Sequence, residues 1–404
     1  MPVIVIDPGH GGENRGGECG DLVEKEINPI VANAMKEHLE KFEDVTVYLT
    51  HDTDQDMSIK DRVIFASEKN ADFLYCLHFN MSVNHNIYGA EVWVPSRGEL
   101  YSKGFSFAEI EMDELTGMGL FSRGIKTRLN DRNTDYYGIL RFSAEYDVPC
   151  VLIEHCHLDH DKDDFALEDG EESLKALGIR DAEAVAKYFG LKSEELGEDY
   201  SGYPVSDIPI PEGIMRPDET EPDVNEVELL SVDRESGLAT IHMTASDQDS
   251  YIQYYAVSLD GGNTYSELME WPRPDKWNES LPEYTFTFSF PYDTEIELRT
   301  IAYNEYDKCT ESNIVAVDVI EDPERLRAQE QQQKMEELLK KQQTYTEMTA
   351  ETFAGLKSPA SAESVQRPSV GLCVTVAIIL LLMLFLLLVL IRNLRGLLRH
   401  KRRR

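Results

Sequence analysis

The chain has 404 residues, 42% of them apolar, which is enough for about two or three domains and excludes a wholly disordered protein. Asp and Glu number 75 against 39 Lys and Arg, so the net charge is −36. Such an acidic chain argues against nucleic acid as a partner. Any anionic ligand would therefore need a local positive site.

Residues 1–192 alternate short apolar runs with amphipathic stretches. VIVID is followed by NPIVANAMKEHLEKF, then by VTVYLT, DRVIFASEK, FLYCLHF and AEVWV. Strands separated by helical patterns are typical of an α/β domain with helices on the faces of its sheet. Farther along, the sequence favours a helix over 117–130, a buried strand in VPCVLIEH, and a closing helix over 181–190.

Residues 193–223 have the composition of a linker. They hold ten acidic residues, one basic residue and five prolines, and cannot bury enough apolar surface to fold alone. From 224 to 321 the pattern changes to period two, as in IQYYAVSLD, with turns such as DGGN between the segments. This pattern predicts a β-sandwich domain, which resembles immunoglobulin or fibronectin type III modules in the strand that ends Ala302-Tyr303-Asn304.

The C-terminal part of the sequence indicates a membrane anchor. Residues 322–345, rich in Glu, Gln, Lys and Leu, predict a polar helix or stalk. A short Ser/Ala/Pro segment joins it to the membrane, so that 322–369 form the stalk and linker. Residues 370–391 are a run of 22 residues without a charge, and about 20 helical residues cross a bilayer. The tail 392–404 holds seven Lys or Arg and no acid. We therefore expect one transmembrane helix rather than a buried core helix, and no signal peptide is expected at the N-terminus.

Four positions in the first domain place a metal ligand or an acid where a strand ends or a helix begins. His10 follows VIVID in a glycine-rich turn, and His78 ends FLYCLHF with Asn80 on the same side of that strand. Glu24 begins the first amphipathic helix, and Glu154 ends an apolar strand, where a carboxylate is costly without a partner. Two imidazoles and one carboxylate form a zinc set that leaves a position for water, whose proton a further glutamate can take.

Each residue also has a structural explanation when it is taken alone. A single histidine in a turn is usually structural, and a glutamate at a helix start suits the helix dipole. DPGHGG could be a phosphate-binding turn, but no GK[ST] follows it, so we discount a nucleotide site. The six cysteines form no CxxC pair and indicate neither a disulfide scaffold nor a cysteine zinc site.

The order His10, Glu24, His78, Glu154 resembles that of the zinc-dependent N-acetylmuramoyl-L-alanine amidases of the amidase-3 type. The resemblance covers about residues 3–190 and rests on VIVIDPGHGG, EKEIN, FLYCLHFN, GAEVWV, GLFSRGIK and PCVLIEHCHLDHDKDD. It implies a mostly parallel or mixed twisted sheet of about six strands with helices on both faces. It also implies that His10, Glu24 and His78 bind Zn²⁺ and that Glu154 is the catalytic acid/base.

Two stretches depart from the usual family pattern. At 78–80 the chain reads HFN, where the family usually has HAN. After Glu154 it reads HCH at 155–157, with His160 beyond, where the family usually has a Gly-Phe-type sequence. These imidazoles could add metal ligands. More often, histidines at strand ends make hydrogen bonds or face solvent. Cys76 is expected to be a small buried residue.

Basic side chains are scarce in this acidic chain, so those near GLFSRGIK are candidates for contacting an anionic peptide stem. The alternative is that they are ordinary surface or helix-end charges. They are Arg123, Lys126, Arg132 and Arg141.

Together these patterns predict a membrane-anchored zinc hydrolase that cleaves the amide between N-acetylmuramic acid and L-alanine in peptidoglycan, in cell-wall remodelling or lysis. The β-sandwich is a candidate for binding a protein or glycan partner. Two alternatives stay open: a non-catalytic, membrane-tethered protein that binds the wall or a partner, and a zinc amidase for another N-acyl substrate. The basic tail favours the cytoplasm, which places the amidase of this single-pass protein outside, facing the wall.

Overall fold

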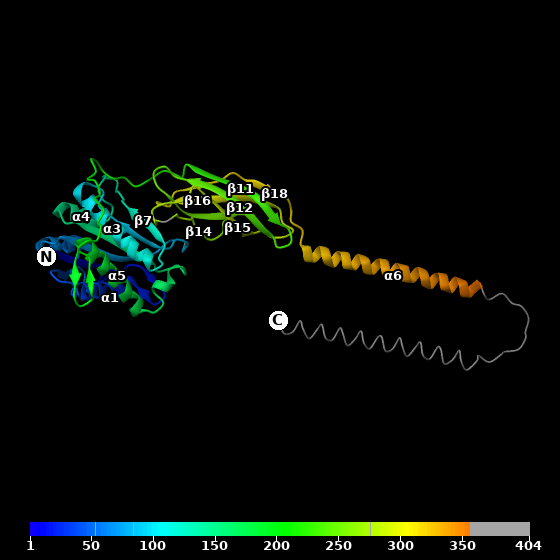
Figure 1. Cartoon of the computed structure of the whole chain (residues 1–404), viewed down its shortest axis with the longest axis horizontal. Helices are drawn as coiled ribbons and strands as arrows, with labels where there is room; N and C mark the ends of the chain where they lie inside the picture. The colour runs from blue at the N-terminus through cyan, green and yellow to red at the C-terminus, as the bar shows by residue number, and fades with distance from the viewer. Residues whose placement is uncertain (53, 84, 275, 356–404) are drawn as a thin grey trace, which may run out of the picture. The chain divides into compact units, whose positions relative to one another are not determined.

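The computed structural model describes residues 1–355 except 53, 84 and 275. Residues 1–326 form one compact unit, in which an α/β region (residues 1–199) precedes a β-rich region (residues 218–320) (Figure 1). In the described part of the chain, no helix combines the length and the apolar character needed to cross a bilayer. The predicted span 370–391 and the basic tail lie outside the described residues.

Six strands form the central sheet of the α/β region, in the order β4-β1-β5-β8-β6-β7. Their bounds are β1 (Val3–Pro8), β4 (Thr46–Leu49), β5 (Phe73–Asn80), β6 (Ala90–Trp93), β7 (Ser122–Lys126) and β8 (Cys150–His157). All neighbouring strands are parallel except β6 and β8, which are antiparallel. The structure thus confirms the mixed, mostly parallel sheet that the resemblance implied.

Helices cover both faces of this sheet. One face carries α1 (Glu24–Leu39), α3 (Gly98–Gly117) and α5 (Glu171–Phe189), and the other carries α2 (Ile59–Glu68) and α4 (Gly138–Tyr146). Successive strand residues point to opposite faces, so Ile4 and Ile6 join the first core while Val5 joins the second. Burial on both faces explains why these strands are apolar runs rather than alternating ones.

One prediction is corrected by the structure. Residues 117–130, predicted to be helical, contain the end of α3 and strand β7, all five residues of which are buried. Gly119 and Gly124 have φ values of 102° and 98°, which no helix contains. The apolar spacing of this segment therefore reflects a buried strand that follows a glycine turn at 119 and contains Gly124.

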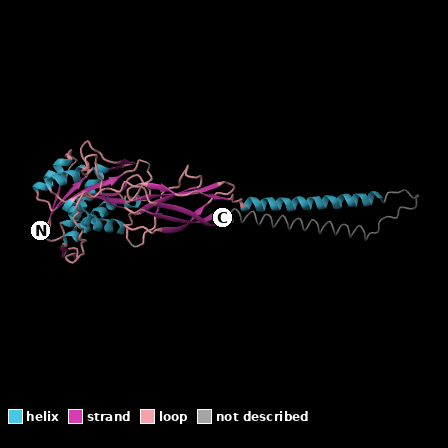
Figure 2. Cartoon of the chain, turned by 90° about the horizontal axis from the view of Figure 1, so that it is seen from above, coloured by secondary structure: helices cyan, strands magenta, loops and turns pink. Residues whose placement is uncertain are grey.

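The β-rich region consists of two antiparallel sheets, and Figure 2 shows it as strands and loops. The first sheet holds β11 (Val224–Asp233), β12 (Leu238–Ser246) and β15 (Glu283–Ser289). The second holds β13 (Ile252–Ser258), β14 (Met269–Glu270), β16 (Ile296–Asn304), β17 (Cys309–Glu311) and β18 (Val315–Val317). One core cluster joins both sheets. The immunoglobulin- or fibronectin-like character of this region stays a prediction.

The remaining elements are short, apart from one polar helix. They are the hairpins β2 (Glu18–Cys19) with β3 (Leu22–Val23) and β9 (Lys192–Ser193) with β10 (Glu198–Asp199), a 3₁₀ turn at Asp164–Ala166, and helix α6 (Pro323–Gly355). The side chains of α6 are exposed from 324 to 352. The predicted domain boundaries at 192, 223, 321 and 369 stay predictions.

The segment 200–217, inside the predicted linker, forms no regular helix or strand but follows the surface of α3. Ser102 Oγ donates to the carbonyl oxygen of Pro209 at 3.1 Å, and Ser106 Oγ donates to that of Ser206 at 2.6 Å. An acidic, proline-rich segment thus gains partners from the neighbouring region that its own composition does not supply.

Candidate metal centre and active site

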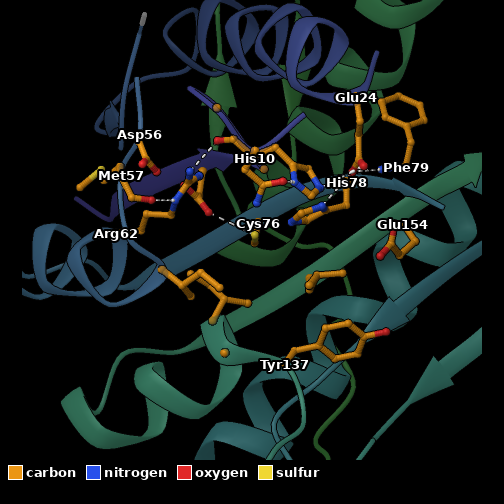
Figure 3. Close-up of a pocket in the computed structure, with 18 residues that line it drawn as sticks. His10, Glu24, Asp56, Met57, Arg62, Cys76, His78, Phe79, Tyr137 and Glu154 are labelled. Atoms are coloured by element: carbon orange, nitrogen blue, oxygen red, sulfur yellow. Dashed lines mark hydrogen bonds and ion pairs between the residues drawn. The ribbon is translucent and has the colours of Figure 1, made fainter. Parts of the chain in front are cut away.

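The carboxyl ends of the parallel strands β1, β5 and β8 meet at one edge of the sheet, which is where open α/β sheets place ligands. A pocket of about 320 Å³ lies there. His10, Glu24, His78 and Glu154 all line it, and Tyr137, at the start of α4, forms part of another wall (Figure 3). The structure therefore brings the four residues selected from the sequence into one pocket.

Three of these residues form a compact group of metal-ligand atoms. One ligand atom from each of His10, Glu24 and His78 lies within 4.8 Å of the other two. Nε2 of His10 is 3.0 Å from Oε2 of Glu24, and Nδ1 of His78 is 2.8 Å from Oε1. Ligands that share one zinc at about 2.1 Å must converge in this way. Within the described ranges no second group of this kind occurs.

Neighbouring polar groups orient the ligand atoms. Nδ1 of His10 lies 2.9 Å from Oδ1 of Asn14, so a proton on Nδ1 satisfies Asn14 and leaves Nε2 free to bind a metal. The backbone N–H of Gly17 donates to Oε2 of Glu24 at 2.7 Å, and that of Phe79 donates to Oε1 at 3.0 Å. These contacts fix the Glu24 carboxylate between the two imidazoles.

The charges in this group suit a cation. Burial alone would raise the pKa of Glu24, but hydrogen bonds with His10 and His78 hold it well below its usual range. Burial would lower the pKa of His10, whereas its hydrogen bond with Glu24 raises it. Glu24 is thus an anion, and a divalent cation could replace the protons that the imidazoles otherwise share with it.

Two glycines make room for the ligand side chains. A Cβ at Gly9 would lie 2.3 Å from Cε1 of His78, and one at Gly16 would lie 2.5 Å from Oε2 of Glu24. Gly16 also has a φ of 71°, which side chains disfavour. The backbone at these two glycines therefore packs directly against the ligand side chains. The two imidazoles and one carboxylate are a donor set that fits a zinc ion.

Glu154 is placed differently from the three ligand residues. It is 8% exposed, its carboxylate points into the pocket in Figure 3, and its Oε2 has no hydrogen-bond partner among the described residues. Burial raises the pKa of Glu154 well above its usual range, and the negative charges of Glu24 and Glu91 raise it further. A carboxyl group with a free oxygen and a raised pKa suits proton transfer at neutral pH.

A buried ion pair supports the turn that carries His10, and sequence reasoning did not select it. Nη1 of Arg62 donates to Oδ1 of Asp7 and to the carbonyl oxygen of Pro8, both at 2.8 Å. Its Nη2 donates to the carbonyl oxygen of His10 at 2.5 Å. Cys76 is buried as expected and lies 3.2 Å from Asp7. The sequence signal that could have indicated this ion pair is the arginine inside the amphipathic segment DRVIFASEK.

The imidazoles after Glu154 make hydrogen bonds and take no part in the metal-ligand group. Nδ1 of His155 lies 3.0 Å from the carbonyl oxygen of His78, and its Nε2 lies 3.0 Å from Asp181. Nδ1 of His157 lies 3.1 Å from the carbonyl oxygen of Gly89. Cys156 between them is buried in the core, so this departure from the family pattern alters the support of β5 rather than the ligand set.

Two of the basic residues considered for an anionic ligand are buried. Arg123 and Lys126 lie on β7, and both donate to Oε2 of Glu91, at 3.0 and 2.9 Å. They are therefore neither free surface cations nor helix-end charges. Arg141 uses its Nη1 on the carbonyl oxygens of residues 135 and 136.

Comparison with known sequences gives matches to amidases over the first part of the chain. Residues 4–187 match the family described as N-acetylmuramoyl-L-alanine amidase. The sporulation-specific N-acetylmuramoyl-L-alanine amidase of Bacillus subtilis (strain 168) is 37% identical over 81 residues, 20% of this chain and 32% of that protein. The amidase LytC of the same organism is 26% identical over 151 residues, 37% of this chain and 28% of that protein. The chain spans about a third of the length of these relatives, and the matches support an amidase catalytic domain at family level.

Solved structures of known proteins also resemble a part of this chain. The catalytic domain of CwlV, an N-acetylmuramoyl-L-alanine amidase from Bacillus (Paenibacillus) polymyxa var. colistinus, is 28% identical with a TM-score of 0.39. The match covers 48% of this chain and 100% of that one. Cwp6 from Clostridium difficile is 27% identical with a TM-score of 0.43, covering 46% of this chain and 29% of that one.

Proposed function

We propose that the α/β region is a zinc-dependent amidase that hydrolyses the bond between N-acetylmuramic acid and L-alanine in peptidoglycan. The observation that carries the proposal is the convergence of His10, Glu24 and His78 in one pocket with the buried carboxyl of Glu154. The family match over residues 4–187 supports the amidase chemistry and the substrate. A zinc amidase for another N-acyl substrate would use the same four residues, so the products must decide.

The residues of the site divide into three tasks. His10, Glu24 and His78 would hold the zinc. When bound, zinc lowers the pKa of a water molecule and polarises the substrate carbonyl. Oε2 of Glu154, which has no other partner in the described chain, can accept the proton of the attacking water and deliver it to the departing amine. Asn14 and the backbone N–H groups of 17 and 79 keep the ligands in place.

Metal dependence of the reaction tests this assignment. We expect the full-length protein to hold about one zinc per chain, to lose peptidoglycan hydrolysis on chelation, and to regain it with added zinc. His78→Ala should lose both metal and activity, whereas Glu154→Gln should keep the metal and lose turnover. Glu114→Gln is the matched control, because Glu114 is nearly buried on α3, pairs with Lys187 and lines no part of the pocket. A fully active Glu154→Gln protein contradicts the role given to Glu154.

We also propose that the chain is anchored in the cell membrane by residues 370–391, with the amidase facing the wall. The support is the uncharged run and the basic tail in the sequence. Helix α6 offers the test, because its exposed Lys340 and Lys341 are accessible to trypsin. Trypsin added to intact cells should release the amidase if it faces outward, and full protection would contradict this orientation.

A further inference from the structure

The β-rich region reaches the candidate site through a buried network of charges. We propose that Asp307 of the β-rich region is a positioning residue for the amidase, acting through Arg123 and Glu91 on the strands that carry His78 and Glu154. The effect on catalysis rests on the function proposed above, whereas the mechanical coupling does not. The β-rich region then belongs to the working unit and does more than space the enzyme from the membrane.

The network begins at the contact between the two regions. Nη2 of Arg123 donates to Oδ2 of Asp307 at 2.8 Å, across 184 positions of the chain. Nε of the same guanidinium donates to Oε2 of Glu91 at 3.0 Å. The side chain of Asp307 is 38% exposed, whereas those of Arg123 and Glu91 are 4% and 3% exposed. The buried guanidinium of Arg123 therefore binds one carboxylate from each region at the same time.

Glu91 carries the network on to the site. Its Oε1 accepts a hydrogen bond from Nδ2 of Asn80 at 2.8 Å, and Asn80 follows the ligand His78 by two residues on β5. Within the sheet β6 pairs directly with β8, which lies between β6 and β5, and Glu91 lies opposite Glu154 there. Glu91 thus contacts the strand of a metal ligand through its carboxylate and the strand of the acid/base through its backbone pairing.

The contact between the two regions is as buried as a protein core. Tyr88 and Tyr254 are 1% and 0% exposed, and the hydroxyl of Tyr254 donates to the carbonyl oxygen of Tyr88. Nε2 of Gln253 donates to the carbonyl oxygen of Arg123 at 2.6 Å, and Arg273 donates to that of Ser122 at 2.7 Å. Hydrogen bonds from the β-rich region therefore hold both the backbone and the side chains of strand β7. Because these contacts keep the two regions together, a change at Asp307 cannot be compensated by a movement of the whole β-rich region.

Loss of the Asp307 charge should move Glu91. In Asp307→Asn the amide oxygen can still accept from Arg123, but the charge-assisted hydrogen bond becomes a neutral one of about half the strength, so Arg123 is held less firmly and can turn toward another partner. A cavity of about 570 Å³, lined by Arg123, Asp307, Glu91 and Asn80, gives it space to do so. Any such turn lengthens the Arg123–Glu91 contact and loosens Asn80 and β6.

The test compares Asp307→Asn with Glu311→Gln in the full-length protein. Glu311 is a matched control, because its carboxylate is 41% exposed and pairs with Arg299 at 2.7 Å inside the β-rich region. Hydrogen exchange of Ala90–Trp93 and of the end of β5 should speed up by about tenfold in Asp307→Asn and stay unchanged in Glu311→Gln. We expect kcat on peptidoglycan to fall by about 3- to 30-fold with KM nearly constant, because Glu154 and the ligands are misplaced but substrate contacts are not.

Two further variants sharpen the result. Asp307→Glu should restore most of the exchange protection and kcat, and Asp307→Asn should add nothing to Arg123→Lys if it acts through that residue. If Arg123→Lys does not fold, the Asp307 variants still decide. Unchanged exchange and kcat in Asp307→Asn would overturn the inference. If the parent protein does not hydrolyse peptidoglycan but exchange responds to Asp307→Asn, the proposed function fails while the coupling stands.

Discussion

Glu91 and Glu154 lie opposite each other on the antiparallel strands β6 and β8, yet their surroundings shift their pKa values in opposite directions. Burial would raise the pKa of Glu91, but the charges of Lys126 and Arg123 lower it. Burial raises the pKa of Glu154, beside which the described residues place no such cation, and Glu24 and Glu91 add to the effect. Divergent environments of paired carboxyl groups identify which one transfers protons. Here they select Glu154 as the acid/base and leave Glu91 a structural anion.

This difference predicts opposite outcomes for the two amide substitutions. Glu154→Gln should lose about 10²- to 10⁴-fold in turnover, while its free energy of unfolding stays within about 1 kcal/mol of the parent or rises. Glu91→Gln should lower the free energy of unfolding by about 3–5 kcal/mol, because it leaves Arg123 and Lys126 buried without their shared partner. Denaturant unfolding of the metal-free proteins at pH 7 measures both. Equal losses of stability would contradict the distinction.

The close contact of Gly9 with His78 predicts that metal binding can be weakened without a change in any ligand residue. In Gly9→Ala the new Cβ would meet the His78 ring at 2.3 Å, so the ring must move. Zinc affinity should fall by about 10- to 100-fold, as when other supports of a ligand are removed. Gly117→Ala is the control, because no atom of the described residues lies within 4 Å of a Cβ there. Titration with a zinc-binding dye reports both, and equal affinities would mean that the close contact with Gly9 does not position His78.

Glu305 predicts how stability depends on pH. It is 9% exposed, and burial raises its pKa to about 7, against opposing effects of Lys126, Tyr251 and Arg273. The folded state therefore binds this proton more tightly than the unfolded chain does. Its contribution to stability is complete below about pH 4.5 and is lost as the pH rises through about 7.

The variant Glu305→Gln removes this titration. Between pH 5 and pH 8 the parent should lose about 3 kcal/mol more stability than Glu305→Gln does. Unfolding midpoints at both pH values measure the difference, with Glu311→Gln as an exposed control from the same region. Parallel curves for the parent and Glu305→Gln would contradict the assignment.

The contact between the two regions predicts that the α/β region is less stable alone. A fragment of residues 1–192 would expose Tyr88 and the guanidinium of Arg123, which are 1% and 3% exposed in the chain. We expect it to melt about 10 °C or more below a fragment of residues 1–326, since several kcal/mol are lost. Thermal scans of the two fragments check this. A 1–192 fragment of equal stability would show that the contact contributes little.

Local signals in the sequence allowed an α/β sheet to be predicted and the four residues to be selected at strand and helix ends, whereas the mixed sheet and the roles of the four residues came from the family resemblance. A strand, its glycine turn and a following histidine lie within ten positions around His10. The supports of the site could not be found in this way, since they pair residues far apart, as Arg62 does with Asp7 and Arg123 with Asp307. Strand β7 was mistaken for a helix because burial on both faces removes the period-two signal.

Analysis by mass spectrometry of the fragments released from purified peptidoglycan tests the central claim most directly. The full-length protein, the zinc-free protein and Glu154→Gln are compared under the same conditions. The account predicts free stem peptides that begin at L-alanine, released only when zinc and Glu154 are both present. Release of other fragments, or no release from a protein that holds zinc at His10, Glu24 and His78, would contradict it.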